Sequence, residues 1–497
     1  MRFSYFKKSG MKAKILILLL LSTSTLTHAQ PFSFIVATDG SGTHTTVQSA
    51  IDACPDNQRS IIFIKNGTYY GQTYLGTKTV ASNKIISLVG ESRDGVILTY
   101  DKSLPMVTKF EEATTFQIYA KDFYAENITF ANTAGVAAGQ ALALYSAGDK
   151  ATFKNCYIKG FQDTYRAKKG TRAYMKSCKI EGTVDFIYAG GTVFFDDCEL
   201  NCLQGGGYIV APEDAAYTIP AASTACGKVL KLEFIFRNCN ITAESGVADN
   251  SYYLGRPWNV TSGAFYLNCT LGKHINPKGW KEWSGNETTA SFAEYNSKDT
   301  NGNPVDVTSR VSWSFQLPKA DVDNLLTPAA VYARVSAIVY DPVSQVVAPL
   351  APTTLLVSGK NLAWSTVNDA AGYVIYKNGQ YLANTTSTTF TDESANEGVY
   401  TLKSIGISGQ LSEVAATVTG LADVQKTNIS ATLTNDILTF SEPVTLKIIG
   451  LDAKLQLSNT QFVQQLNITQ IKSGVYLLQM TNTDGFKHTQ KLIITHK

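Results

Sequence analysis

The fold is decided by a short pattern that recurs along the chain, in Asn155-Cys156-Tyr157-Ile158, Ser177-Cys178-Lys179-Ile180, Asp197-Cys198-Glu199-Leu200, Asn238-Cys239-Asn240-Ile241 and Asn268-Cys269-Thr270-Leu271. Each copy has a polar residue, a cysteine, a variable residue and an aliphatic residue. Asn127-Ile128-Thr129-Phe130 fits with isoleucine in the cysteine position. The shorter steps between these markers indicate a solenoid with rungs of about 20 to 22 residues. Longer steps are read as loop insertions, and the step from Cys198 to Cys239 as two rungs.

Each copy also reads as a short strand. An aromatic residue precedes every cysteine, and these are Phe153, Tyr174, Phe194, Phe236 and Phe265. No helical period of 3.6 runs between the strands, which argues against doubly wound and barrel α/β folds. The sequence therefore predicts a right-handed parallel β-helix. Its marker cysteines are expected to be stacked small core residues and not metal ligands.

Composition supports a mainly β protein of more than one domain. The chain has 497 residues, of which 17% are charged, with 25 tyrosines and 23 phenylalanines. That balance favours strands and turns over long surface helices. Five of the 43 basic residues lie in the segment 1–29, which holds no acid, so 38 basic side chains face 40 acidic ones in the remainder. This near-neutral charge argues against a nucleic-acid partner.

The segment 1–29 has the features of a secretory signal peptide. Basic residues are followed by the apolar run Ile15 to Leu21 and by small residues before Gln30. The apolar run is too short to span a bilayer, and no later stretch is long and apolar enough to do so. We therefore predict a protein that is exported, with no membrane span, and is either secreted or attached to the cell surface.

The predicted solenoid occupies residues 31–340. Near its start, Thr46 to Ala53 reads as a short amphipathic helix that would cover the open end of the coil. Residues 341–354 hold three prolines without clear periodicity, which predicts a linker.

Two small β-sandwich-like modules are predicted after the linker. Residues 355–420 contain short alternating strands with a hairpin signal at Asn378-Gly379, and this segment resembles a fibronectin type III domain. Residues 421–497 again read as short strands. They resemble the sorting domain that the type IX secretion system of some Gram-negative bacteria recognises, which implies a bacterial protein. A second small adhesive or spacer sandwich is the alternative.

Several common catalytic arrangements have no sequence support. Only His44 and His274 among the five histidines fall in the predicted solenoid, and there is no Gly-x-Ser-x-Gly elbow. A Ser-His-Asp hydrolase is therefore poorly supported. Zinc-ligand spacing, a phosphate loop and a dinucleotide fingerprint are also absent from the sequence.

Carboxylates offer a better candidate site. Asp163 and Asp185 follow the marker cysteines Cys156 and Cys178 at the same offset. Adjacent rungs should therefore stack them, with backbones about 4.8 Å apart. Gln140 and Gln162 are separated by the same step as the aspartates and should stack likewise.

Two carboxylates this close cannot both ionise easily, so one should stay protonated at neutral pH while the other keeps a depressed pKa. Arg256 is the candidate cation that selects the ionised member. The paired amides could donate hydrogen bonds to an oxyanion. The alternative is a polar ladder that merely stabilises the solenoid.

The motifs that carry these residues resemble the pectin methylesterase family. They occur in family order as Asp39-Gly40-Ser41-Gly42, Gln140-Ala141-Leu142-Ala143-Leu144, Gly160-Phe161-Gln162-Asp163-Thr164, Gly182-Thr183-Val184-Asp185-Phe186-Ile187 and Leu254-Gly255-Arg256-Pro257-Trp258. The resemblance implies a right-handed parallel β-helix that hydrolyses galacturonate methyl esters of pectin, with no metal and no cofactor.

The resemblance also implies individual roles. Asp185 would attack the ester carbonyl, and Asp163 would protonate the leaving methoxide and then deprotonate the attacking water. Gln140 and Gln162 would hold the oxyanion, and Arg256 would orient Asp185.

Aromatic residues are predicted to contact the sugar rings. By the family resemblance these are Trp258 and Trp280, with Tyr188 as an aromatic wall beside the nucleophile, where the family has phenylalanine. Gln140 and Arg256 are expected to contact substrate as well. Trp283 is expected to hold the fold together.

Two alternative functions stay open at this point. One is another pectin-active β-helix enzyme, a lyase or a glycosidase, and the other is a non-catalytic pectin-binding adhesin.

The sequence also leaves a disulfide bond open, because Cys202 and Cys226 flank an insertion and could pair. The expected partners are pectin and, through the tail, the secretion machinery. The protein is expected to be a monomer.

Overall fold

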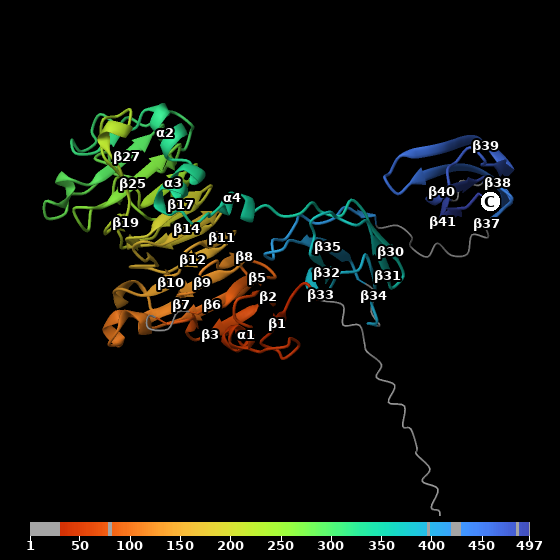
Figure 1. The fold of residues 1–497 in the computed structure, drawn as a ribbon, viewed down its shortest axis with the longest axis horizontal. Coiled ribbons are helices and arrows are strands. Elements are labelled where there is room, and N and C mark those ends of the chain that lie inside the picture. The colour runs from red at the N-terminus through yellow and green to blue at the C-terminus, as the bar shows by residue number, and fades with distance from the viewer. Residues whose placement is uncertain (1–29, 78–81, 395–397, 419–428, 484–486, 497) are drawn as a thin grey trace, which may run out of the picture.

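The structure is a computed structural model that describes residues 30–77, 82–394, 398–418, 429–483 and 487–496 (Figure 1). The predicted signal peptide lies outside the described residues. The chain is mainly β, and most of its strands belong to large parallel sheets, which confirms the predicted fold class.

Three parallel sheets form the solenoid, and we call them sheets A, B and C. Sheet A consists of β1 (Phe34–Val36), β2 (Arg59–Ile64), β5 (Ile85–Gly90), β8 (Tyr124–Glu126), β11 (Ala151–Lys154), β14 (Arg172–Lys176), β17 (Thr192–Asp196), β22 (Phe234–Arg237), β25 (Gly263–Leu267), β27 (Ser291–Tyr295) and β29 (Phe315–Gln316). Sheet B consists of β3 (Gly67–Tyr70), β6 (Val96–Tyr100), β9 (Thr129–Asn132), β12 (Tyr157–Lys159), β15 (Lys179–Gly182), β18 (Glu199–Cys202), β23 (Asn240–Ala243), β26 (Thr270–Leu271) and β28 (Lys298–Asp299). Sheet C consists of β4 (Thr73–Leu75), β7 (Thr114–Ile118), β10 (Leu142–Ser146), β13 (Tyr165–Ala167), β16 (Val184–Ala189), β19 (Tyr208–Pro212) and β24 (Tyr253–Gly255).

The repeated pattern marks the corner between sheets A and B. The polar residue before each cysteine has a positive φ, for example 47° at Asn155 and 53° at Ser177. Short polar side chains tolerate this left-handed conformation better than other non-glycine residues. Neighbouring rungs are further joined by side chains at this corner, where Nδ2 of Asn155 donates a hydrogen bond to Oδ1 of Asn127 at 2.8 Å. The repeat is thus a turn signal stacked once per rung.

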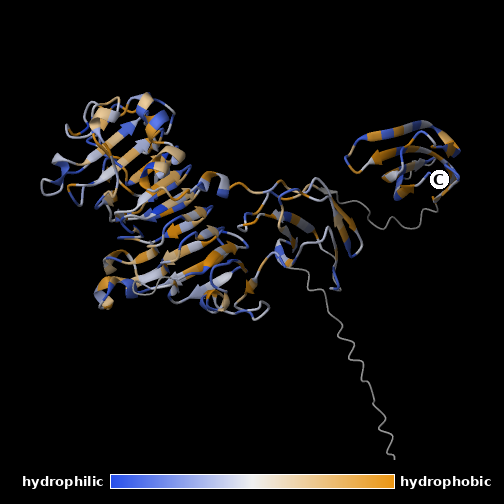
Figure 2. Ribbon diagram, in the orientation of Figure 1, coloured by the Kyte–Doolittle hydropathy of each residue, from blue (hydrophilic) through white to orange (hydrophobic). Residues whose placement is uncertain are grey.

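Apolar side chains of all three sheets fill the interior of the coil. Hydrophobic residues recur along the strands of the solenoid in Figure 2. Phe195, Phe236 and Tyr266 stack in consecutive rungs with ring centroids 4.5 Å apart. The marker cysteines are buried in the same core. This packing agrees with their expected role as small core residues.

The step from Cys198 to Cys239 is one rung, so the expectation of two rungs is wrong. Strand β17 pairs directly with β22, and β18 pairs directly with β23. The extra length forms an insertion after β19, which holds the antiparallel pair β20 (Thr218–Ile219) and β21 (Leu230–Lys231). A long step between markers therefore reports an insertion as readily as a second rung.

Cys202 and Cys226 do not pair, although their positions suggested it. Both cysteines are free thiols. Cys202 ends β18 and lies in the interior core, whereas Cys226 packs against the outer apolar cluster on sheet A. The wall of the solenoid therefore separates them.

Helices cover parts of the solenoid that the repeats leave open. Helix α1 (Val47–Ala53) begins after Thr46, whose hydroxyl accepts a hydrogen bond from the Ser49 backbone, and it buries Val47 and Ile51 against the first rungs. This matches the predicted end cap. Helices α2 (Lys319–Leu325) and α3 (Pro328–Val335) were not predicted, and they bury the outer face of sheet A.

Short 3₁₀ helices occupy several connections between the strands. They are η1 (Leu104–Met106), η2 (Phe110–Ala113), η3 (Val136–Ala138), η4 (Ala221–Ser223) and η5 (Asn286–Thr288).

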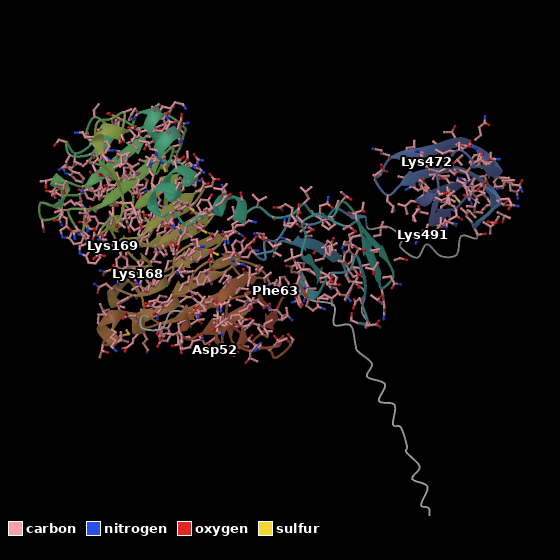
Figure 3. All side chains as sticks on the ribbon, in the orientation of Figure 1. Asp52, Phe63, Lys168, Lys169, Lys472 and Lys491 are labelled. Carbon is pink, nitrogen blue, oxygen red and sulfur yellow. The ribbon has the colours of Figure 1, made fainter. Side chains whose placement is uncertain are left out.

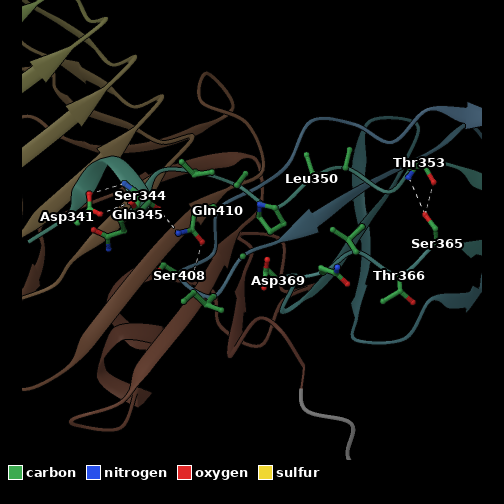
Figure 4. Close-up of a pocket in the computed structure, with 18 residues that line it drawn as sticks. Asp341, Ser344, Gln345, Leu350, Thr353, Ser365, Thr366, Asp369, Ser408 and Gln410 are labelled. Atoms are coloured by element: carbon green, nitrogen blue, oxygen red, sulfur yellow. Dashed lines mark hydrogen bonds between the residues drawn. The ribbon is translucent and has the colours of Figure 1, made fainter.

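The segment predicted as a linker is anchored to its neighbours. It contains helix α4 (Pro342–Gln345). The Gln345 side chain accepts a hydrogen bond from Thr152 of the solenoid at 2.7 Å, and its backbone carbonyl accepts one from Gln410. A pocket of about 1100 Å³ lies beside it, lined by residues of α4, the segment from Val347 to Ala351 and the next module (Figure 4).

The next module is built from two sheets around a shared core. One contains β34 (Thr389–Thr391), β31 (Asn361–Trp364), β30 (Leu355–Ser358) and β36 (Thr417–Val418), which runs parallel to β30. The other is antiparallel and contains β33 (Gln380–Thr385), β32 (Gly372–Lys377) and β35 (Tyr400–Ile405). The resemblance of this module to fibronectin type III domains stays a prediction.

This module packs against sheet A near the start of the solenoid. Phe63 of β2 lies at the contact (Figure 3), with Tyr381 at a centroid distance of 4.8 Å. Glu91 and Glu126 of the solenoid accept backbone hydrogen bonds from Tyr381 and Leu411 of the module. The contact lies on sheet A and leaves the outer face of sheet C uncovered.

The C-terminal module forms one antiparallel sheet. Its strands are β37 (Ala431–Thr434), β38 (Ile437–Gly450), β39 (Leu455–Asn467), β40 (Gly474–Asn482) and β41 (Lys487–Ile494). Register shifts interrupt the pairing of β38 with β39. We predicted two sandwich-like modules, and this one differs by having a single sheet with its own apolar core.

Candidate active site

The structure places Asp163 and Asp185 on adjacent rungs at the edge of sheet C. The register pairs Tyr165 with Ile187, so the two aspartates occupy equivalent positions in the coil. The backbone N–H of Asp163 donates to the carbonyl of Val184 at 3.1 Å. Equal rung lengths therefore bring the two residues together, as their spacing predicted.

Both aspartates adopt a left-handed backbone conformation. Their φ angles are 63° at Asp163 and 50° at Asp185. Such conformations are sparsely populated for residues with a side chain and concentrate at functional sites. The same bend therefore recurs in two consecutive rungs and sets the direction of both carboxyl groups.

Gln140 and Gln162 lie in a second stacked pair beside the aspartates. A parallel β-bridge joins them, and both side chains are half-buried. Within the described residues, neither side-chain amide has a protein hydrogen-bond partner. Their N–H groups are thus available to a bound molecule.

Arg256 binds Asp185 through two hydrogen bonds. Nε donates to Oδ1 at 3.0 Å and Nη2 donates to Oδ2 at 2.6 Å. Arg256 follows β24, and its own backbone N–H is fixed by the Val210 carbonyl at 3.0 Å. This fork geometry is the strongest form of ion pair that arginine makes with a carboxylate.

Two aromatic rings hold the Arg256 guanidinium in place. Its central carbon lies 3.9 Å from the centroid of Tyr208 and 4.0 Å from that of Trp283. Cation–π contacts of this kind stabilise a cation that has lost part of its hydration. The arginine is therefore oriented from three sides.

The environment divides the two carboxyl groups into a neutral and a charged member. Burial and the nearby charge of Asp185 raise the pKa of Asp163 to about 8. Burial also raises the pKa of Asp185, but Arg256 opposes this rise by hydrogen bonding and charge. Asp163 therefore holds the proton at neutral pH. The expectation of a depressed pKa for Asp185 is wrong, because burial outweighs the effect of Arg256.

Two of the predicted aromatic residues border the site. Trp258 has 39% of its surface exposed, and its ring centroid lies 6.1 Å from that of Tyr188. Tyr188 is 6% exposed and follows Asp185 on β16. Tyr188 lies near Asp163, and Trp258 lies against Tyr188.

The prediction that Trp280 contacts substrate is wrong. Its side chain is 0% exposed and packs between Tyr266 and Phe292, with centroid distances of 5.6 and 4.8 Å. A β-bridge to Gly255 continues the rung at this point and directs the ring into the core. Trp283, expected to be structural, is the tryptophan of this segment that lies at the site.

Sequence reasoning missed two further residues of the site. Tyr208 encloses Arg256 together with Trp283, and Arg166 lies between the rings of Phe110, Tyr145 and Tyr188. The rung spacing offers a signal for Arg166, because it places this residue opposite Tyr188 of the next rung. No motif marks Tyr208.

Within the part of the chain that the structure describes, no group of three or more His, Cys, Asp or Glu side chains is arranged to hold a metal ion. The same residues form no helix that is long and apolar enough to cross a membrane.

The solenoid and its acid–amide–arginine site define a parallel β-helix protein with a hydrolase-like centre. Residues 33–327 match the family model described as Pectinesterase. Because this match covers more than half of the chain, the chain belongs to the Pectinesterase family. Residues 426–495 match the family model described as Secretion system C-terminal sorting domain. This confirms the predicted likeness of the tail, and the protein is secreted or attached to the cell surface.

Individual relatives agree with the family assignment. The chain is 32% identical to a pectinesterase/pectinesterase inhibitor of Brassica campestris over 311 residues, covering 59% of this chain and 52% of the relative. It is 32% identical to pectinesterase 4 of Arabidopsis thaliana over 292 residues, covering 57% and 47%. The chain thus spans about half the length of these relatives.

A solved structure shows the same fold. Pectin methylesterase from carrot superimposes with a TM-score of 0.54 and 28% identity, covering 62% of this chain and 95% of that one. The right-handed parallel β-helix predicted from the repeats is therefore confirmed.

Proposed function

We propose that the protein hydrolyses methyl esters of galacturonate in pectin, releasing methanol and leaving a free carboxylate. One observation carries the proposal: Asp163 and Asp185 stack on adjacent rungs, and Arg256 binds only the second of them. An acid and a nucleophile thereby arise from the same side-chain type. Membership of the Pectinesterase family supports the substrate class.

The first step uses both aspartates. The Asp185 carboxylate attacks the ester carbonyl carbon and forms an acyl-enzyme through a tetrahedral intermediate. The methoxide leaves with the proton of Asp163, which becomes a carboxylate. The free amides of Gln140 and Gln162 donate hydrogen bonds to the oxyanion.

The second step restores the site. The Asp163 carboxylate removes a proton from water as the water attacks the acyl-enzyme. The bond to Asp185 breaks, which releases the galacturonate carboxylate and returns Asp185 as the partner of Arg256. Trp258 and Tyr188 provide apolar faces for the sugar rings, and Gln140 and Arg256 contact the ester.

The remaining parts of the chain support export and display of this domain. We propose that the tail engages the secretion machinery, which the sorting-domain match supports. The solenoid, linker, fibronectin-like module and tail are proposed to span 31–340, 341–354, 355–420 and 421–497. A monomer is supported by the covering of sheet A by α2, α3 and the docked module.

The decisive experiment measures the products formed from methylated pectin. We expect methanol release without new unsaturated or reducing chain ends, which a lyase or a glycosidase would generate. Asp185→Asn should abolish methanol release while leaving the circular dichroism spectrum unchanged. Normal turnover by that variant would contradict the assignment of Asp185 as the nucleophile.

A further inference from the structure

Arg166 is an arginine on the outer face of sheet C without a carboxylate partner among the described residues. It lies on β13, where the register pairs it with Tyr145 on one side and Tyr188 on the other. The guanidinium carbon lies 4.3 Å from the ring centroid of Phe110, 5.4 Å from that of Tyr145 and 5.5 Å from that of Tyr188. The three rings form an aromatic box around the guanidinium.

Other arginines of the solenoid show what such a group ordinarily binds. Arg172, Arg237 and Arg310 each donate at least two hydrogen bonds to one carboxylate. In the part of the chain that the structure describes, no Asp or Glu lies within ion-pair distance of Arg166. Its Nε is buried and lacks a hydrogen-bond partner in the same set of residues. An unpaired buried donor on a cation carries a cost that a bound anion would remove.

The position of Arg166 ties this unused cation to the reaction centre. It follows Asp163 by three positions, and Tyr188 joins its aromatic box to Trp258. Asp163 is the acid nearest in sequence, but it holds a proton at neutral pH and does not neutralise the guanidinium. Lys168 follows the end of β13 and is exposed (Figure 3). β13 and the residue after it therefore carry two cations, Arg166 and Lys168, and the Tyr188 ring packs beside the first of them.

We propose that Arg166 binds the free carboxylate of a galacturonate residue adjacent to the one whose ester is attacked. The inference rests on the proposed function and specifies its substrate. A planar carboxylate fits the guanidinium fork, and the flanking rings pack against the sugar. A methyl ester at the same place offers no charge and fewer acceptor contacts. The protein thus favours pectin that already carries free carboxylates.

The test compares Arg166→Met with the natural protein on two oligogalacturonides of equal length. One is fully methyl-esterified and the other carries alternating free carboxylates. We expect the variant to lose kcat/KM on the second substrate at least about tenfold more than on the first, because a hydrogen bond to a charged group contributes about 1.5–3 kcal/mol. The loss should appear in KM, and Arg166→Lys should restore part of it. Equal losses on both substrates would overturn the proposal.

A binding measurement with a ligand that has no ester to hydrolyse tests the carboxylate site separately from the proposed esterase activity. Calorimetry with a fully de-esterified hexagalacturonate should show affinity about tenfold weaker for Arg166→Met than for Arg334→Met, a matched control that removes an exposed arginine on α3. If no variant releases methanol but this difference persists, the carboxylate site stands and the esterase proposal fails. If methanol release is normal and the two variants bind the hexamer equally, the carboxylate site is refuted.

Discussion

Arg256 holds Asp185 through two parallel hydrogen bonds while Tyr208 and Trp283 enclose its guanidinium. The nucleophile is therefore oriented by a cation that is itself immobilised. Because Arg256 does not bind Asp163 in the same way, the two aspartates differ in charge although they occupy equivalent positions in the coil.

Arg256→Lys should lower kcat by about 10- to 100-fold. Lysine keeps the charge, but its ammonium cannot form the fork or stack as a plane between two rings. The loss of one charge-assisted hydrogen bond corresponds to about 1.5–3 kcal/mol. Steady-state methanol release measures the change. Lys298→Arg, at an exposed position on β28, serves as a control. Wild-type kcat in Arg256→Lys would show that bidentate geometry is dispensable.

The rate should follow a bell-shaped pH profile. Asp163 must begin protonated, so activity should fall as pH rises through its pKa of about 8. Asp185 must be ionised, and its pKa lies above the ordinary value of 3.8, so the acid limb should lie above that pH. Initial rates measured from acidic to alkaline pH test this. A rate that stays constant well above the pKa of Asp163 would contradict its role as the acid.

Asp163→Asn should stabilise the solenoid increasingly as pH rises. The folded protein holds the Asp163 proton with a pKa of about 8, against an ordinary value of 3.8 in the unfolded chain. The folded state binds more protons between these values, so wild-type stability falls with rising pH in that window. Asparagine does not titrate. The free energy of unfolding of the variant should therefore exceed that of the wild type by an amount that grows by at most about 1.4 kcal/mol per pH unit.

Thermal unfolding at several pH values inside that window measures this difference. The unfolding temperature of Asp163→Asn, relative to that of the wild type, should rise by a few degrees from the acidic to the alkaline end of this window. Asp56→Asn, at an exposed position, is the control, and its unfolding temperature should change with pH in the same way as that of the wild type. A constant offset between Asp163→Asn and wild type would show that Asp163 is not buried as a neutral acid.

Two tryptophan substitutions should separate substrate contact from packing. Trp258→Ala should raise KM by roughly five- to tenfold with little change in unfolding temperature, because the loss of one contact ring costs about 1 kcal/mol or more. Trp280→Ala should instead destabilise the solenoid by about 3–5 kcal/mol, because it empties a fully buried site. The reverse pattern would contradict the assignment of the two rings.

The repeat made the solenoid and the stacked aspartates predictable. Each marker cysteine follows a corner whose conformation is local, so its spacing reports rung length directly wherever no insertion intervenes. Since Asp163 and Asp185 have the same offset from that corner, their proximity follows without knowledge of any loop.

What escaped prediction depends on segments outside the repeat. Trp280 lies between β26 and β27, where a β-bridge to Gly255 directs its ring into the core, and no period in the sequence reveals this pairing. Phe110, which contacts Arg166, comes from η2, which precedes the strand β7. Helices α2 and α3 cover sheet A because its outer face is apolar, but their own sequence is too short to show a helical period.

The paired left-handed bends also constrain how this protein can lose its activity. A residue that replaces either aspartate must adopt the same positive φ, which is unfavourable for branched and bulky residues. Asparagine and glycine adopt a positive φ most readily. Inactive descendants that still fold should therefore carry these two residues, and a non-hydrolysing pectin binder is one substitution away.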